Sequence, residues 1–433
     1  MKNRILAAGT AVVLVGGLAA CSAGSSGSSS DDWSIPAEDP TATIRVAGIM
    51  SEEQWAPIIE AFNAEHPTIT VKPDQTPFDS LDSVLQTRIT SKTGDPDVYW
   101  ANMPNIPAQV SRGYAADLTE QLQDSTDNFL SAAIEATTVD GRIYGMPIAQ
   151  STQMLFYNKD LLAAAGVAEP SADPENRSAW EEIEAGAAAA LAAGAENGLA
   201  FEQYNYYQLQ PLAMQLGGNA GASGEGNLTP DVNSPEWVEA YSWFGSLFDE
   251  GISPRGVPAT QVSTLFAAGS LAYMVGGPWN LDSLSANSDV NWGVALQPVF
   301  EGGTPVTPTG SWALSINAFS KNKEAAAIFV KWMSSGDGYV LNALQTELPA
   351  TTTAQGAYFA REIFSTPEGE KAKAIIEFET ANTAVNRVQT VGFIEFDNIL
   401  TSAYSDIING SPAQDVLDKA QADIEKAWSV YQK

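Results

Sequence analysis

The sequence predicts an α/β protein in which a parallel or mixed sheet is flanked by helices. Two observations support this prediction. Strand-like and helix-like segments alternate in the first part of the chain. The chain has 433 residues, of which 44% are hydrophobic, so it is long enough to form about two or three domains with large cores.

The first elements follow one another closely along the chain. Strands are expected at residues 43–47, 69–73 and 97–100, and helices around 55–62 and 81–89. Ser51 is a candidate N-cap of the first helix, which Pro67 ends just after His66. In such sheets ligands bind beyond the carboxyl ends of the strands. Here those ends are residues 48–51, 76–79 and 101–105.

The later part of the chain continues the α/β pattern. Helices are expected at 178–194, 236–248, 261–268 and 323–334, and strands at 272–275, 293–296 and 312–316. An apolar stripe over residues 416–431 predicts a C-terminal helix.

The acidic composition excludes one class of partner. The formal net charge is −31, and no run of Lys or Arg interrupts it. Such a surface repels phosphate backbones, so no nucleic-acid partner is expected.

The N-terminus predicts export and a lipid anchor. Residues 1–20 combine a basic start, a short apolar stretch and a small-residue cleavage site before Cys21, as in bacterial lipoproteins. Cys21 is the only cysteine, so disulfides are excluded. Residues 21–40 begin with a Gly/Ser-rich run that is typical of a flexible tether. We expect a protein at the outer face of a bacterial cytoplasmic membrane, held by its N-terminal lipid.

The usual catalytic and cofactor motifs are absent from the sequence. His66 is the only histidine, and no P-loop, GxGxxG or GxSxG motif occurs. We therefore predict neither a cofactor nor a metal site. Glycosidase chemistry needs only two carboxylates, for which Glu202, Asp282 and Glu395 are conceivable, but spacing pairs no two of them.

Aromatic and amide side chains gather at the predicted loops instead. Sugars offer hydroxyls that pair with amides and C–H faces that pack on aromatic rings. The residues concerned are Trp100, Asn102, Asn105, Gln203, Tyr204, Asn205, Tyr206, Tyr207, Gln208, Trp279, Asn280, Trp312, Phe393 and Phe396. Core packing is the alternative reading, above all for Trp100 and Trp312.

Six stretches, in order, resemble the landmarks of a known family. They are HPTITV, GDPDVYWAN, the segment 139–167 with YNKDLL, LFAAGSLAYMVGGPWNLDSL, INAFSKNKEAAAIFVKWM and ELPATTTA. The chain is thereby similar to extracellular solute-binding proteins of ABC importers, in the sugar-binding family that includes maltose-binding protein.

This resemblance implies a two-lobe periplasmic-binding-protein-like fold with mixed sheets and a ligand cleft between the lobes. The first lobe would comprise residues 41–149 and 315–365, and the second 150–314 and 366–433. The hinge would lie at 147–149, which explains the uncharged run 150–153 (QSTQ) as cleft lining. The expected function is capture of a neutral mono- or oligosaccharide by lobe closure and delivery to the permease subunits and ATPase of an ABC importer, by a protein that is not an enzyme and is a monomer.

The candidate ligand-binding residues follow from strand ends, loop composition and the resemblance. They are Met50, Phe78, Asp79, Trp100, Asn102, Asn105, Gln150, Ser151, Gln153, Gln203, Tyr204, Asn205, Tyr207, Trp279, Asn280, Asp282, Gly310, Ser311, Trp312, Arg387, Phe393 and Glu395. Trp279 matches the family's stacking tryptophan. Asn205 and Ser151 replace acidic sugar ligands of some relatives, so the same malto-oligosaccharide contacts are not expected.

Three alternatives stay open at this point. The same fold could bind a polyol, glycerol phosphate or a peptide. The protein could be a sugar receptor that is not coupled to transport, or a lipid-anchored glycoside hydrolase. A phosphate ligand would need convergent cations, and Arg387 is the main candidate in the expected cleft.

Overall fold

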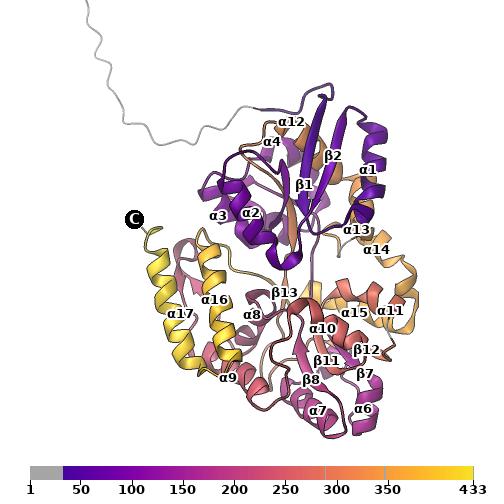
Figure 1. Ribbon diagram of the computed structural model, residues 1–433, viewed down its shortest axis with the longest axis vertical. Helices are drawn as coiled ribbons and strands as arrows, with labels where there is room; N and C mark the ends of the chain where they lie inside the picture. The colour runs from indigo at the N-terminus through magenta and orange to yellow at the C-terminus, as the bar shows by residue number, and fades with distance from the viewer. Residues whose placement is uncertain (1–32, 288, 346–347, 433) are drawn as a thin grey trace, which may run out of the picture. The chain divides into compact units, whose positions relative to one another are not determined.

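Two β-sheets organise the protein (Figure 1). The computed structural model describes residues 33–432, except 288 and 346–347. The strand order is β2-β1-β3-β14-β6 in a five-stranded sheet and β12-β7-β11-β8 in a four-stranded sheet. We call the elements around the five-stranded sheet the first lobe, and those around the four-stranded sheet the second lobe. Among the described residues, no helix combines the length and apolarity needed to cross a bilayer.

The first sheet is mixed, as the sequence predicts. Its strands are β1 (Ala42–Gly48), β2 (Ile69–Gln75), β3 (Val98–Asn102), β6 (Met146–Pro147) and β14 (Trp312–Ile316). β1 is parallel to β2 and β3, whereas β14 runs antiparallel to β3 and β6. β14 begins at Trp312, so residues 312–314 pair within the first sheet. The sequence instead predicts that the chain returns to the first lobe only at residue 315.

Helices from both ends of the first lobe pack together over its sheet. Ser51 caps α1 (Glu52–Glu65) through a capping box with Gln54, as expected of a serine before two glutamates. Phe62 of α1 packs edge-on against Phe329 of α12, with ring centroids 5.1 Å apart. The helices of this lobe are α1, α2 (Leu81–Thr90), α3 (Ile106–Ser111), α4 (Thr119–Leu122), α5 (Ser131–Glu135), α12 (Lys323–Met333), α13 (Gly336–Gln345) and α14 (Thr352–Phe359).

The second sheet is also mixed. Its strands are β7 (Met154–Asn158), β8 (Asn197–Phe201), β11 (Leu271–Gly276) and β12 (Trp292–Leu296). β8 and β11 are parallel, and β7 is antiparallel to β11 and β12. Alternate residues of β7 belong to different hydrophobic clusters, Leu155 and Tyr157 to one and Met154 and Phe156 to the other. The sheet is therefore covered on both faces.

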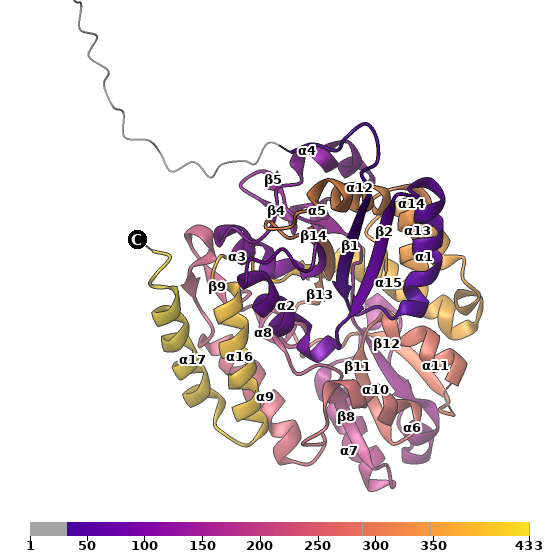
Figure 2. The ribbon, with the colours of Figure 1, turned by 45° about the horizontal axis from the view of Figure 1, so that its top comes forward.

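The helices of the second lobe come from the middle and the end of the chain (Figure 2). They are α6 (Lys159–Ala165), α7 (Trp180–Ala192), α8 (Tyr206–Gln215), α9 (Pro235–Asp249), α10 (Ala259–Ala267), α11 (Leu281–Asn287), α15 (Pro367–Asn382), α16 (Phe393–Ile408) and α17 (Ala413–Trp428). A buried ion pair joins two distant segments of this lobe. Arg177 donates to both carboxylate oxygens of Glu379, at 2.7 and 3.0 Å, and both side chains are almost fully buried.

Three segments connect the two lobes. The first runs from β6 through Gln150, whose backbone N–H donates to the Leu348 carbonyl, to β7. The second is β13 (Thr307–Thr309), which continues into β14, and the third leads from α14 through α15 to β15 (Ala384–Asn386). β13 and β15 are parallel partners, so two of the three segments form a ribbon.

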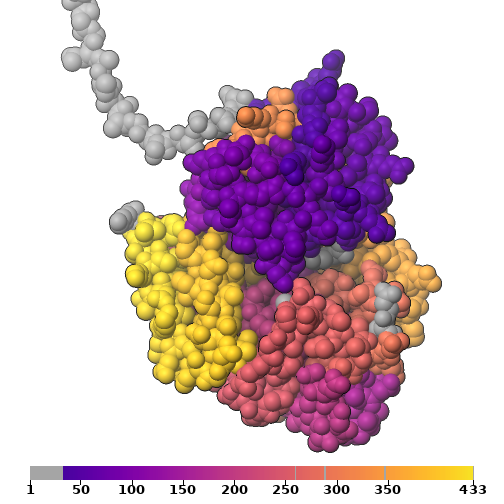
Figure 3. Space-filling model, viewed as in Figure 1, coloured from indigo at the N-terminus to yellow at the C-terminus, as the bar shows by residue number. Residues whose placement is uncertain are grey.

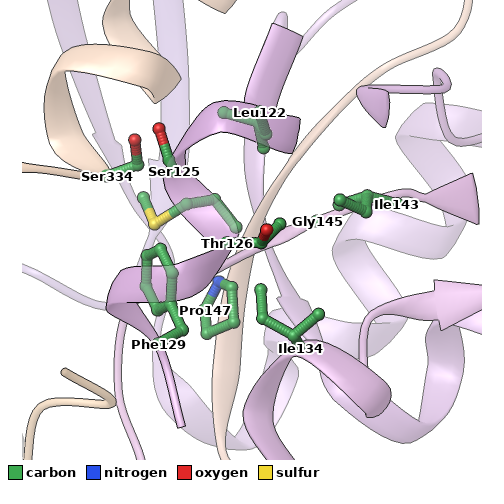
Figure 4. A pocket seen from close by; sticks show the side chains of 10 residues that line it. Leu122, Ser125, Thr126, Phe129, Ile134, Ile143, Gly145, Pro147 and Ser334 are labelled. Carbon is green, nitrogen blue, oxygen red and sulfur yellow. The ribbon is translucent and has the colours of Figure 1, made fainter. Parts of the chain in front are cut away.

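Short elements complete the fold. They are the strand pairs β4 (Thr138–Val139) with β5 (Arg142–Ile143) and β9 (Ala222–Ser223) with β10 (Thr229–Pro230), and the 3₁₀ turns η1 (Phe78–Ser80), η2 (Met103–Asn105), η3 (Gln123–Asn128), η4 (Pro174–Asn176), η5 (Glu225–Asn227), η6 (Pro278–Asn280) and η7 (Glu362–Ser365). Leu122, Phe129, Ile134 and Pro147 line a small apolar cavity of about 10 Å³ in the first lobe (Figure 4). This cavity is too small for an organic ligand.

The helices and strands predicted above are present, with ends shifted by a few residues. His66, expected at a helix end, is the C-cap of α1, and its Nδ1 lies 2.8 Å from the Asp39 carboxylate. Cys21, the predicted lipidation site, lies outside the described residues.

Candidate ligand-binding site

Trp279 and Glu202 form the second-lobe side of the candidate site. β8 and β11 are parallel neighbours, so the loops after them, with Glu202 and with Gly277 to Asn280, meet at one edge of the sheet. The Trp279 Nε1–H donates to Glu202 Oε2 at 2.7 Å, and Asn280 Nδ2 donates to the same oxygen at 2.8 Å. Glu202 thus fixes the orientation of the Trp279 ring, which remains partly exposed.

Tyr207 links this edge to the segments that cross between the lobes. Its ring centroid lies 6.5 Å from that of Trp279, and its hydroxyl donates to Ser151 Oγ at 2.7 Å. Ser151 Oγ in turn donates to the Gly310 carbonyl at 3.0 Å. Tyr207 is in the first turn of α8, which Asn205 caps by accepting a hydrogen bond from the Gln208 N–H.

A row of aromatic rings forms the first-lobe side. Phe78 in η1 lies edge-on to Trp312, with centroids 6.1 Å apart, and Trp312 lies 5.9 Å from Trp100. Phe78 is 38% exposed, Trp312 7% and Trp100 1%. Phe78 therefore presents ring surface toward solvent, whereas Trp312 keeps only a small exposed area and Trp100 lies in the core.

The charged centre of the site consists of Asp82, Arg387 and Asp397. Asp82 comes from α2 in the first lobe and accepts a hydrogen bond from Asn102 Nδ2 at 3.2 Å. Arg387 follows β15, and its guanidinium lies over the Tyr207 ring, 5.2 Å from the centroid. Arg387 interacts electrostatically with both carboxylates, although they come from different lobes. Among the described residues, Arg387 Nε has no hydrogen-bond partner even though the side chain is only 8% exposed.

The enclosed position of these groups shifts their pKa values. The pKa of Asp397 is raised to about 6, mainly by burial and also by the nearby Asp82 charge, while Arg387 lowers it. Desolvation by the surrounding protein also raises the pKa of Asp82, although this residue is exposed, while hydrogen bonds from Asn102 and Asn105 and the charge of Arg387 lower it. Burial lowers the pKa of Arg387, while Tyr207 and the two aspartates raise it.

This arrangement suits a ligand rich in hydroxyl groups. A hydroxyl can accept from the guanidinium of Arg387 and donate to a carboxylate at the same time. Tyr207, Trp279 and Trp312 supply ring faces for the apolar side of such a ligand. The space-filling view shows the N-terminal part of the first lobe, in indigo, meeting the second lobe along a seam (Figure 3).

Comparison with known proteins identifies the family and the fold. A model of the family described as bacterial extracellular solute-binding protein matches residues 57–364. The chain belongs to that family. The fold of this solute-binding protein is also that of solved members, which confirms the predicted two-lobe α/β architecture.

Three similar proteins illustrate the relationship. A binding protein of Brucella abortus (strain 2308) is 29% identical over 280 residues, 62% of this chain, and the match spans 65% of the relative's length, which is less than two thirds. The maltodextrin-binding protein of Bacillus subtilis (strain 168) is 25% identical over 385 residues, 86% of this chain and 85% of the relative. The GacH receptor of Streptomyces glaucescens, solved unliganded and with acarbose, has a TM-score of 0.75, 25% identity, and coverage of 90% of this chain and 99% of the receptor.

Most of the residues expected to bind ligand lie near the charged centre or near the aromatic rings described above. The sequence-predicted residues that the structure brings there are Phe78, Trp100, Asn102, Asn105, Ser151, Tyr207, Trp279, Asn280, Gly310, Trp312 and Arg387. Ser311 and Asp79 adjoin them, because the Ser311 carbonyl accepts from Met103 of η2 and Asp79 follows Phe78 in η1. Gln203 and Asn205 are hydrogen-bonded to each other at the start of α8, at 3.0 Å.

The remaining predicted residues have other contacts. Phe393 is buried between Tyr206 and Phe396, and Tyr204 packs on Phe244 and Phe248. Asp282 pairs with Arg361 at 2.6 Å, and Glu395 pairs with Arg112 at 2.7 Å. Met50 belongs to the core of the first lobe, and Gln150 and Gln153 are buried at 3% and 0% exposure.

Sequence reasoning did not identify Asp82 or Asp397 as site residues. It considered Glu202 only as a conceivable carboxylate of a glycosidase. Asp82 was detectable as an acid in the first turn of a helix that follows a strand-end loop. Asp397 lies directly after Phe396, one of the aromatic residues noted in the sequence, but nothing in the sequence itself marked this aspartate.

Proposed function

We propose that this protein binds a neutral carbohydrate, a mono- or oligosaccharide, between its two lobes and delivers it to an ABC importer. The proposed lobes comprise residues 41–149 with 315–365 and residues 150–314 with 366–433, as the sequence predicts. The one exception is residues 312–314 of β14, which pair within the first sheet. Closure of the lobes adds contacts from the second side of the ligand, so the closed form binds more tightly.

The observation that carries the proposal is the electrostatic interaction of Arg387 with two carboxylates of different lobes, Asp397 and Asp82. The buried Nε of Arg387 needs an acceptor, and Asp82, which already accepts from Asn102, and Asp397 can each accept a further hydrogen bond. A sugar hydroxyl satisfies both needs at once, whereas a phosphate would meet two negative charges for one positive charge. The site therefore favours a neutral ligand over an anionic one.

The relatives support the same ligand class. The Bacillus subtilis protein binds maltodextrin by its name, and the GacH receptor was solved with acarbose. The matches cover 86% and 90% of this chain. The ligands named for these two proteins differ, so the identity of the sugar does not follow from them.

The expected cellular setting completes the proposal. Lipidation of Cys21 would hold the protein at the outer face of the bacterial cytoplasmic membrane, where it would act as a monomer. Its partners would be the permease subunits and ATPase of the importer. Binding alone, without turnover of the sugar, fits this role.

Calorimetric titration with neutral sugars tests the proposal directly. Purified protein is titrated with neutral mono- and oligosaccharides and with the corresponding uronic acids and sugar phosphates. We expect heat from one group of neutral sugars, and a loss of about tenfold or more in affinity for Trp279→Ala. A matched control is Trp332→Ala, because the Trp332 Nε1–H also donates to a glutamate, Glu65 at 2.9 Å, but in the first lobe away from the site.

Two results would contradict the proposal. One is that no neutral sugar binds while a sugar phosphate does, since the charge argument would then be reversed. The other is an equal loss of affinity in Trp279→Ala and Trp332→Ala, which would indicate general destabilisation rather than a ligand contact.

A further inference from the structure

A second cavity lies beside the segments that cross between the lobes. Its volume is about 390 Å³, within the range of small-molecule sites. Leu130 and Phe359 of the first lobe and Ile376 of the second lobe contribute apolar walls, and Gln150, Thr309 and Asn386 come from the three crossing segments. The cavity is therefore bounded by both lobes and by the connections between them.

This cavity is separate from the candidate sugar site. Ala384 and Asn386 of β15 line it, and alternate residues of a strand point to one face. Arg387 is next in sequence and lies instead over Tyr207. The same alternation holds in the first crossing segment, where Gln150 lines the cavity and Ser151 bonds Tyr207. The crossing segments thus separate two sites, with the charged centre on one side and the cavity on the other.

The lining indicates the chemistry of an occupant. Leu130, Leu348, Phe359 and Ile376 form an apolar surface. The polar groups are uncharged amides and hydroxyls, except for the exposed Glu377, and one of them is the buried Thr380 Oγ1, which has no hydrogen-bond partner among the described residues. A buried hydroxyl without a partner is costly, so an occupant that bonds it gains free energy. The fitting class is a small neutral molecule with an apolar body and one amide or hydroxyl group.

Contacts between the lobes relate the cavity to the closed form. Arg112 of the first lobe pairs with Glu395 of α16 at 2.7 Å and donates to the Tyr431 hydroxyl at 3.0 Å. In Figures 1 and 2, α3 and α16 lie on one side of β13, and α14 and α15 lie on the other. The cavity is thus present while the lobes touch on the opposite side of the crossing segments. If the lobes separated at the contact between α3 and α16, the space between α14 and α15 would narrow.

We propose that this cavity is a second binding site, for a small neutral amphiphile, whose occupancy stabilises the closed form and raises sugar affinity. The coupling rests on the proposed function, because it assumes that the lobes close on a sugar. By linkage, the sugar must raise the affinity of the cavity for the amphiphile by the same factor.

The test uses hexanamide as the probe and a variant that fills the cavity. Ala381 lines the cavity but is exposed in the last turn of α15, so Ala381→Trp blocks the space without burying a misfit. Ala163→Trp, at an exposed position of α6, is the matched control. Hexanamide binding is followed by ligand-observed NMR without sugar, and sugar affinity is then measured by calorimetry with and without saturating hexanamide.

We expect hexanamide to bind wild type and Ala163→Trp but not Ala381→Trp, and to raise sugar affinity about three- to tenfold, within the usual range of coupling between sites. Equal binding to all three proteins, or no binding to wild type, would overturn the site. Unchanged or lower sugar affinity at saturation would overturn the coupling. If no sugar binds at all, the proposed function fails, while the NMR result still decides whether the site exists.

Discussion

Replacing Asp397 by Asn should stabilise the ligand-free protein at neutral pH. Burial, with the Asp82 charge, raises the pKa of Asp397 from the ordinary 3.8 to about 6, so the folded state holds this proton more tightly than the unfolded state. The contribution of the Asp397 carboxyl group to the free energy of unfolding is therefore most favourable below pH 3.8 and falls as the pH rises to about 6. The shift of about two pKa units corresponds to about 3 kcal/mol lost above pH 6.

Urea unfolding of wild type and Asp397→Asn measures this loss. The difference in unfolding free energy should be near zero at about pH 4 and reach about 3 kcal/mol in favour of the variant at about pH 7.5. Asp406→Asn on the exposed face of the same helix should show no such gap. A gap of equal size at both pH values would refute the reasoning, since it could not come from the ionised carboxylate.

Two further substitutions probe packing and orientation. Arg177→Met leaves the buried Glu379 carboxylate without its cationic partner and should lower the unfolding free energy by about 3 to 5 kcal/mol. The double variant Arg177→Met with Glu379→Gln should lose much less, and equal losses in denaturant titrations would argue against a buried ion pair. Gly277→Ala places a Cβ against the Trp279 ring, so sugar affinity should fall about tenfold or more with little change in melting temperature, and unchanged affinity would show that Trp279 does not contact the ligand.

Local signals in the sequence were sufficient to predict the secondary structure and the fold class. The alternation of residues 43–47 and the N-cap at Ser51 each depend on a few neighbouring residues, and both are confirmed. The family landmarks then supplied the two-lobe arrangement, which no local pattern contains. Trp279 was identifiable because its motif, GGPWN, is short and contiguous.

The charged centre could not be predicted in the same way. Asp82 of α2 comes near Arg387, at the end of β15, and Asp397 of α16, although α2 is far from both in sequence. Sequence spacing also could not distinguish Glu395 from Asp397, two residues apart on α16. The first pairs with Arg112, and the second interacts with Arg387. Helical rotation alone gives these two acids different partners.

The position of β14 in the first sheet limits when the first lobe can fold during synthesis. Residues 98–102 pair with a strand that begins at Trp312, and Asn317 Nδ2 donates to the Pro96 carbonyl across 221 positions. A ribosome must therefore complete most of the chain before the first half can acquire its central hydrogen bonds. Until then the edge of β3 stays open, and such unpaired edges invite aggregation. A chain truncated near residue 300 should accordingly be a substrate for chaperones and proteases rather than a stable half-protein.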